Sequence, residues 1–349
     1  MMTGIDITTL NYARVAAALV FMVIASALDL KYRRVKDILW IAMGAVGIAL
    51  LEAQILLGNL PSLYHLLLVP VVIIFADAFI ERKPLYDGET GRVNAPWLGI
   101  FALAGIILAF LLIRSWQDNA FLALFTVPVI MILAYILYYT DILRGGADAK
   151  ALMAVGILMP VYPEIGSYPL WNMHSLGDMT TIVFPFALTM LMNAAIISIF
   201  LPLSLAVYNL SKGSIHHKAM FLGYRVPLDE ADRKKEWLMQ KVRGGELVIR
   251  YMPEREEHYG ESDDDDDESE DDDSDNKDDT HDNDDADEDK LEEEQFKKDI
   301  EALRGYGLDK VWVSPKLPFI VFMTAGLVIS LVVGNLLLGL VAGIATLGR

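Results

Sequence analysis

The sequence of 349 residues contains no cysteine. This absence excludes disulfide bonds, thiolate metal sites and cysteine nucleophiles. The sequence also lacks a GxxxxGK[ST] loop and an HExxH motif, so neither a P-loop enzyme nor a zinc protease of that type is expected. Outside one acidic tract the chain lacks the basic excess of a nucleic-acid-binding protein, and we therefore expect no nucleic-acid partner.

The net charge of −18 comes from one short part of the chain. Residues 261–294 contain 23 of the 47 Asp and Glu residues and only two of the 29 Lys and Arg residues. Residues 261–290 are almost entirely Asp, Glu, Ser and Asn, and a segment of this composition buries too little apolar surface to fold. The sequence therefore predicts a disordered acidic linker inside an otherwise nearly neutral and apolar chain.

The long apolar runs predict a membrane protein. A helix that crosses a bilayer needs about 20 apolar residues, within a range of roughly 17–25. On this criterion we expect an all-α polytopic membrane protein with about eight transmembrane helices and a cytosolic α+β insert that carries the acidic tract. The predicted spans are 11–28, 38–57, 63–80, 97–113, 121–139, 147–160, 182–210 and 317–346, of which the sixth is short.

Lys and Arg residues predict the orientation of the spans, because they are enriched in cytosolic loops. They gather after the first, third and fifth spans, as Lys31, Arg33, Arg34, Lys36, Arg82, Lys83, Arg92, Arg144 and Lys150. These loops are therefore predicted to be cytosolic, and both termini to face outside.

The same orientation predicts five parts of the chain. They are a membrane domain over 1–210, a cytosolic insert over 211–260, an acidic linker over 261–290, a cytosolic helix and return over 291–315, and a last transmembrane helix over 316–349. Inside the cytosolic parts the patterns predict helices over 231–242 and 291–303 and a strand over 246–252.

Two aspartates at the ends of predicted spans are the candidate catalytic residues, since ionisable residues at membrane spans are often functional. Asp29 closes the first span and Asp148 opens the sixth. An even number of spans separates them, so both are predicted at the cytosolic face. Two close carboxyl groups share one proton near neutral pH, so that one activates water while the other donates a proton. This chemistry needs no metal or organic cofactor, and we predict none.

The residues around both aspartates resemble a known family. Gly145-Gly146-Ala147-Asp148 resembles the GxGD motif of membrane aspartyl proteases, with Ala147 at the third position, and the glycines would permit a sharp turn and a close approach. Residues 29–37 (DLKYRRVKD) are similar to the first catalytic motif of type IV prepilin peptidases. Residues 221–227 (FLGYRVP) and 311–318 (VWVSPKLP) resemble the archaeal branch, the preflagellin (archaellin) peptidases.

The resemblance implies a multi-span enzyme of the cell membrane that cleaves class III signal peptides at the cytosolic face. Asp29 and Asp148 would be its catalytic pair. Its partners would be the lipid bilayer and membrane-embedded precursors with short basic leaders, such as archaellins and pilins. Bacterial members often carry a Cys-rich zinc segment and methylate the new N-terminus; without cysteine, that segment is absent and methylation is not expected.

Other interpretations stay open at this point. Asp29 could pair with Arg33 at the membrane interface, and Asp148 could cap a helix. A presenilin-like protease could use Asp141 instead. A proton- or cation-coupled transporter would draw on Asp77 and Glu52. Between the two aspartate motifs the chain has two more predicted spans, over 63–80 and 97–113, than compact family members have.

Overall fold

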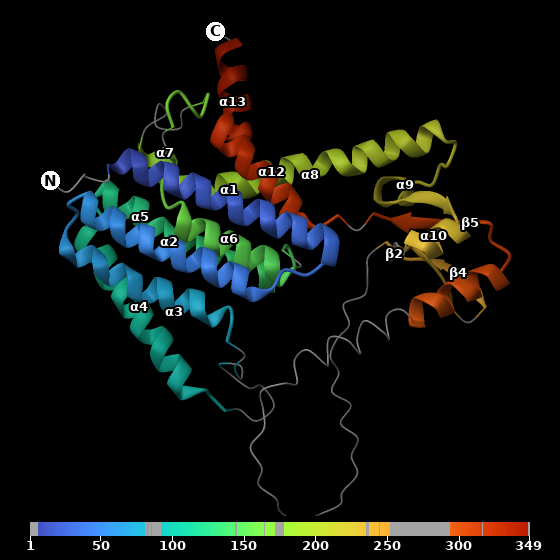
Figure 1. Cartoon of the computed structure of the whole chain (residues 1–349), viewed down its shortest axis with the longest axis horizontal. Coiled ribbons are helices and arrows are strands. Elements are labelled where there is room, and N and C mark those ends of the chain that lie inside the picture. Colours follow the sequence, from blue (N-terminus) through green and yellow to red (C-terminus); the bar gives the residue numbers. More distant parts are fainter. Residues whose placement is uncertain are drawn as a thin grey trace, which may run out of the picture. The chain divides into compact units, whose positions relative to one another are not determined.

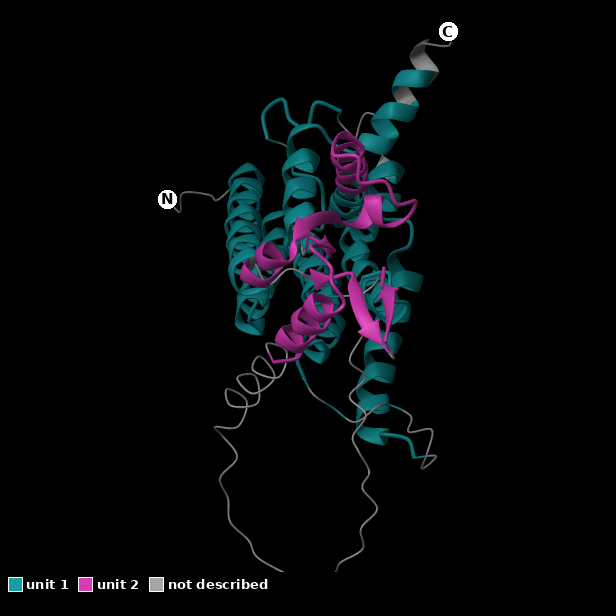
Figure 2. Cartoon of the chain, turned by 90° about the vertical axis from the view of Figure 1, so that its right-hand side faces the viewer, with its two compact units in different colours: residues 1–199, 317–349 teal, residues 200–316 magenta. Residues whose placement is uncertain are grey.

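The computed structural model describes residues 6–80, 82, 85, 92–143, 145–163, 165–171, 178–234, 237–243, 245–251, 294–315 and 317–347. The chain divides into two compact units (Figure 2). Unit 1 comprises Met1–Ile199 and Leu317–Arg349, and unit 2 comprises Phe200–Lys316. The predicted disorder of 261–290 lies outside the described residues.

Unit 1 is built from helices (Figure 1). In chain order they are α1 (Ile7–Tyr32), α2 (Asp37–Leu57), the 3-10 helix η1 (Ser62–Leu67), α3 (Leu68–Asp77), α4 (Ala95–Ser115), α5 (Asn119–Tyr139), α6 (Gly146–Leu158), α7 (Asp178–Val183), α8 (Phe186–Ser211, which continues into unit 2), α12 (Phe319–Val332) and α13 (Leu336–Leu347).

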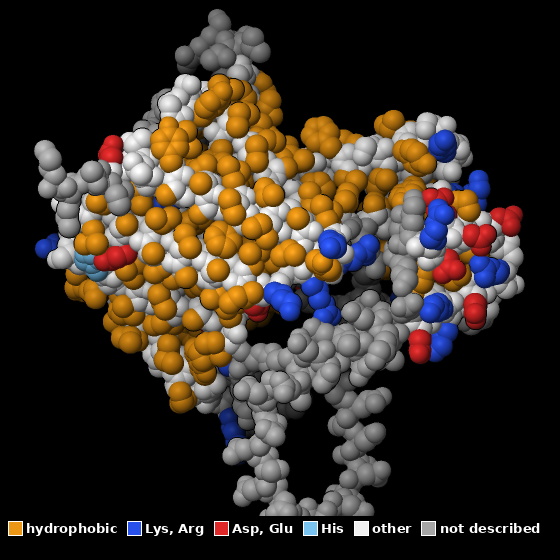
Figure 3. Space-filling view, in the orientation of Figure 1, with side chains coloured by type: hydrophobic (Ala, Val, Ile, Leu, Met, Phe, Trp, Pro, Cys, Tyr) orange, Lys and Arg blue, Asp and Glu red, His pale blue; other side chains and the backbone are white. Residues whose placement is uncertain are grey.

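Five of these helices, α1, α2, α4, α5 and α8, are long and apolar enough to cross a membrane. The stretch of η1 and α3 and the helix α12 are apolar but shorter. Hydrophobic side chains cover most of the visible face of unit 1 (Figure 3). The predicted class, a mostly helical polytopic membrane protein, is confirmed, whereas the count of eight spans stays a prediction.

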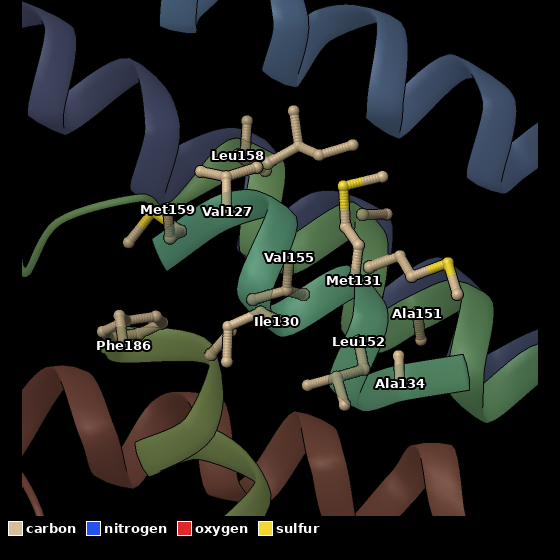
Figure 4. Close-up of a cluster of buried hydrophobic side chains, with 14 of the residues drawn as sticks. Val127, Ile130, Met131, Ala134, Ala151, Leu152, Val155, Leu158, Met159 and Phe186 are labelled. Atoms are coloured by element: carbon tan, nitrogen blue, oxygen red, sulfur yellow. The ribbon is translucent and has the colours of Figure 1, made fainter. Parts of the chain in front are cut away.

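The short helix α6 lies inside the bundle and is buried over most of its length. Ala149 and all residues from 151 to 158 are buried. With 13 residues α6 is only about 20 Å long, at roughly 1.5 Å per residue. Its side chains meet those of α5 and Phe186 of α8 (Figure 4). Residues 151–158, enclosed in this way, need no polar face, which explains why they are all apolar.

Small residues allow the helices around α6 to approach closely. A Cβ atom added at Gly47 of α2 would lie 3.0 Å from the backbone nitrogen of Leu158. One added at Gly156 of α6 would lie 2.9 Å from Cγ2 of Ile130 in α5. Contacts between α2 and α6 and between α5 and α6 are thus set by glycine, as is common between membrane helices.

The last predicted span is not one helix. α12 ends at Val332 and α13 begins at Leu336, with Gly334 between them at a φ of 101°. The side-chain amide of Asn193 in α8 donates a hydrogen bond to the Gly334 carbonyl at 2.9 Å, and its oxygen accepts one from the Leu336 amide at 3.0 Å. The prediction of one helix over 317–346 is therefore wrong, because a neighbouring side chain satisfies the backbone groups that the break exposes.

Unit 2 contains two small antiparallel sheets. In the first, β5 (Lys310–Ser314) lies between β1 (Tyr224–Pro227) and β2 (Trp237–Leu238). The second pairs β3 (Gln240–Arg243) with β4 (Glu246–Ile249). The helices α9 (Ala219–Leu222), α10 (Leu228–Lys234) and one over 294–305 complete the described part of the unit.

The secondary structure of unit 2 differs from the prediction at one place. The predicted helix over 231–242 ends at Lys234, and Leu238 instead pairs with Val313 of β5. Strand pairing with a distant segment overrides local propensity here. The predicted strand over 246–252 is confirmed for Glu246–Ile249, and the predicted helix over 291–303 appears over 294–305.

Candidate active site

Asp29 lies in the last turn of α1 and is half-buried. The helix ends at Tyr32, because Arg33 adopts a left-handed conformation with a φ of 57° and donates its amide to the Asp29 carbonyl at 2.9 Å. One turn earlier, the hydroxyl of Ser26 lies 2.7 Å from that of Thr324 in α12. A hydrogen bond to the C-terminal part of the chain therefore holds the turn of α1 that leads to Asp29.

Asp148 lies in the first turn of α6 and is also half-buried. Its amide donates to the Gly145 carbonyl at 3.0 Å, and the backbone of Gly145 hydrogen-bonds to the Asp148 carboxyl group. A Cβ atom at Gly145 would lie 2.6 Å from Oδ2 of Asp148. At Gly146 the nearest atom to an added Cβ would be a ring carbon of Tyr138, 3.8 Å away.

The two glycines of the motif therefore differ in their structural role. Gly145 has a φ of −88°, which any residue can adopt, so a sharp turn does not explain it. Its lack of a side chain makes room for the carboxyl group of Asp148. The neighbouring Ala147 is half-buried and packs against the core of unit 1.

The structure brings the two predicted carboxyl groups into the same region. α1 and α6 contact each other, and the charge of Asp29 acts on the carboxyl group of Asp148. The arrangement therefore offers two half-buried carboxyl groups from helices that are far apart in the sequence. Two such groups are suited to general acid–base chemistry on a water molecule.

An ion pair beside this site was not predicted from the sequence. Nζ of Lys150 in α6 lies 2.6 and 2.8 Å from the two carboxylate oxygens of Asp37, the first residue of α2. The same ammonium group lies 5.0 Å from the ring centre of Phe79. The sequence analysis used Lys150 only for topology and Asp37 only within the first motif. The signal in the sequence was an acidic residue at the end of the first motif and a basic residue shortly after Asp148.

Two other acidic residues of unit 1, Asp77 and Glu52, lie in separate interactions. Asp77 is 6% exposed, pairs with Nε of Arg82 at 2.5 Å and accepts a hydrogen bond from the Tyr135 hydroxyl at 2.9 Å. The hydrogen bond from Arg82 to Asp77 raises the pKa of Arg82, which keeps the guanidinium charged. Glu52 lies 2.9 Å from Nδ1 of His65.

Asp141 is exposed and has a φ of 57°. Asp and Asn tolerate this left-handed conformation better than most residues, which gives Asp141 a local conformational role in the turn after α5. Among the described residues, no group of three or more His, Asp or Glu side chains could hold a metal ion.

A protein-family model and a known protein are similar to parts of this chain. Residues 216–336 match a family model described as the archaeal peptidase A24 C-terminus, type II. A preflagellin peptidase of Methanococcus voltae is 28% identical over 166 residues, which cover 44% of this chain and 66% of that relative. The chain is therefore similar, over parts of its length, to archaeal A24 and preflagellin peptidases. The match spans slightly less than two thirds of the relative's length.

Within the segment that matches the family model, the structure joins two stretches whose resemblance to archaeal peptidases is visible in the sequence. Residues 221–227 include β1, and residues 311–318 include most of β5. β1 and β5 pair antiparallel, with Tyr224 opposite Val313 and Pro227 opposite Lys310. The family segment also contains Thr324, whereas Asp29 and Asp148 lie before it.

Proposed function

We propose that the protein is a membrane aspartyl endopeptidase that removes short basic class III leader peptides from archaellin or type IV pilin-like precursors. The observation that carries the proposal is the approach of two half-buried carboxyl groups, Asp29 and Asp148, on two helices that contact each other. The similarity of parts of the chain to archaeal A24 and preflagellin peptidases supports it. The name of the Methanococcus voltae relative supports the class of substrate.

The chemistry follows from the charges of the pair. Two close carboxyl groups do not both ionise readily, so the pair retains one proton. The ionised carboxylate takes a proton from a water molecule, whose oxygen attacks the scissile carbonyl carbon. The protonated partner gives its proton to the carbonyl oxygen. When the resulting gem-diol intermediate collapses, the carboxyl group that took the proton from water gives it to the leaving nitrogen, and the other carboxylate takes a proton back from a gem-diol hydroxyl. The peptide bond breaks, the leader is released, and the pair again holds one proton.

The predicted topology supports cleavage at the cytosolic face. Lys and Arg residues are enriched in the loops at the ends of α1 and α3 and before α6, which favours a cytosolic location for these ends. Asp29 lies in the last turn of α1 and Asp148 in the first turn of α6, so the pair would act at that face. A basic leader that stays in the cytosol while the precursor's apolar helix lies in the membrane would present its cleavage site there.

Replacing either aspartate with asparagine tests the proposal. Asn has nearly the shape of Asp but does not accept and return the proton, so Asp29→Asn and Asp148→Asn should each abolish leader removal. Because the residues act as a unit, the double variant should be no worse than either single variant. Leader removal is measured as a gel shift of a co-expressed precursor, and membrane insertion is checked by fractionation.

The matched control is Asp141→Asn, because Asn tolerates the left-handed conformation of Asp141 and the turn should be preserved. The cleavage rate should also follow a bell-shaped pH profile. At low pH both groups are protonated and no base is present, and at high pH both are ionised and no acid is present. Normal cleavage by Asp29→Asn or Asp148→Asn would contradict the proposal, and an inactive Asp141→Asn variant would favour the presenilin-like alternative.

A further inference from the structure

The ion pair of Asp37 and Lys150 joins the first motif, which contains Asp29, to the turn of α6 that follows Asp148. Asp37 begins α2, directly after the turn that follows Asp29 and α1. Lys150 lies one half-turn beyond Asp148 in α6. The ammonium group contacts both carboxylate oxygens of Asp37, so the contact fixes direction as well as distance.

The exposure of this pair argues against a main role in stability. The side chain of Lys150 is 21% exposed and that of Asp37 is 48% exposed. Exposed ion pairs contribute little to folding, because water and salt screen them. The pair nevertheless lies where α2 and α6 meet, and the contact of Lys150 with the ring of Phe79 adds a third segment of the chain.

A small displacement at this point would reach the carboxyl group directly. Asp148 lies in the same first turns of α6 as Lys150, and the nearby Gly145 already leaves little free space around the carboxyl group. The charge of Lys150 is compensated by that of Asp37, with which it is paired. The pair is therefore placed to orient Asp148 rather than to change its charge.

We propose that Asp37 and Lys150 are positioning residues that orient the first turns of α6, so that the carboxyl group of Asp148 faces that of Asp29. This inference rests on the proposed peptidase function. A misplacement of about 1 Å can cost on the order of a hundredfold in rate. Loss of the pair should therefore lower kcat, while precursor binding, and with it KM, is largely preserved.

The experiment uses the full chain in detergent with a purified precursor. Lys150→Met keeps the aliphatic stem over Phe79 and removes the charge, and Asp37→Asn removes the partner charge. Each should lower kcat by roughly tenfold or more, with KM close to that of the unaltered chain. The double variant should be no worse than either single variant, because both changes break the same contact. Lys150→Arg should retain most of the activity.

Two further readouts separate positioning from other roles. The pH profile of Lys150→Met should keep its shape and position, and its thermal unfolding should remain close to that of the unaltered chain. Glu52→Gln is the matched control, since it removes a similarly exposed pair, with His65, at another place in unit 1 and should keep normal kcat.

Several results would overturn the inference. Normal kcat in Lys150→Met, additive losses in the double variant, or a shifted pH profile would each exclude a positioning pair. An unaltered chain that leaves every precursor intact would overturn the proposed function itself, and this inference with it.

Discussion

Gly145 shows why a glycine can be required without an unusual backbone conformation. An added Cβ atom would lie 2.6 Å from Oδ2 of Asp148, a distance that forces the carboxyl group to move. We expect Gly145→Ala to lower the rate of leader cleavage by at least tenfold, because catalysis is sensitive to displacements of about 1 Å. The rate is measured with a purified precursor, and thermal unfolding reports whether the fold is preserved.

Gly146→Ala is the control for this prediction. Its Cβ atom would make an ordinary contact with Tyr138 at 3.8 Å, and Gly146 lies at the start of α6, where alanine is compatible with a helix. Cleavage should stay close to that of the unaltered chain. Equal losses in the two variants would show that the motif needs flexible glycine backbone rather than space beside Asp148.

At the scale of the elements, Gly47 in α2 sets the distance between α2 and α6. A Cβ atom there would lie 3.0 Å from the backbone nitrogen of Leu158 and from Cγ2 of Ile157. Overpacking of this kind typically costs about 1–3 kcal/mol. Gly47→Ala should therefore lower the thermal unfolding temperature in detergent and, by displacing α6, reduce cleavage.

The comparison for Gly47 is Gly105 in α4, where an added Cβ atom would meet nothing within 4 Å. α4 has only two buried residues, Ala104 and Leu111, so most of its surface is free of contacts within the described structure. Gly105→Ala should leave the unfolding temperature unchanged or slightly higher, since alanine favours helices. A loss as large as that of Gly47→Ala would show that the close contact with α6 is not the cause.

At the scale of the whole molecule, the structure gathers alternate loops of unit 1 at opposite ends. The Tyr64 hydroxyl, after α2, hydrogen-bonds to Asp118, before α5. Lys150, near the start of α6, contacts Asp37 at the start of α2 and Phe79, which follows α3. Contacts of this kind are expected when successive helices run antiparallel. The distribution of Lys and Arg predicts which end of the helices is cytosolic.

The chain has no native cysteine, so single introduced cysteines can report this topology. We expect Asn59→Cys and Gln117→Cys to react with an impermeant reagent added from outside, and Gly88→Cys to react only after the membrane is opened. Gly88 and Gln117 lie on either side of α4 in the sequence. Labelling of both from the same side would mean that α4 does not cross the membrane.

The sequence by itself determined the class of the protein. Runs of about 20 apolar residues indicated membrane helices. In the hydrocarbon core of a bilayer the backbone must satisfy its hydrogen bonds internally, and a helix does so within one segment. The sequence also selected Asp29 and Asp148, since charged residues at the ends of apolar runs are few. Their catalytic role, the eight spans, the five-part division of the chain and the cytosolic face remain predictions.

Tertiary structure decided what local sequence does not encode. The break at Gly334 depends on Asn193 in another helix, and the strand at Leu238 depends on Val313 in another part of the chain. The same holds for the contact of Ser26 with Thr324 and of Asp37 with Lys150. Each is a contact between segments distant in sequence. The physical reason is that helix periodicity and hydrophobicity fix the elements, whereas their partners follow only from packing.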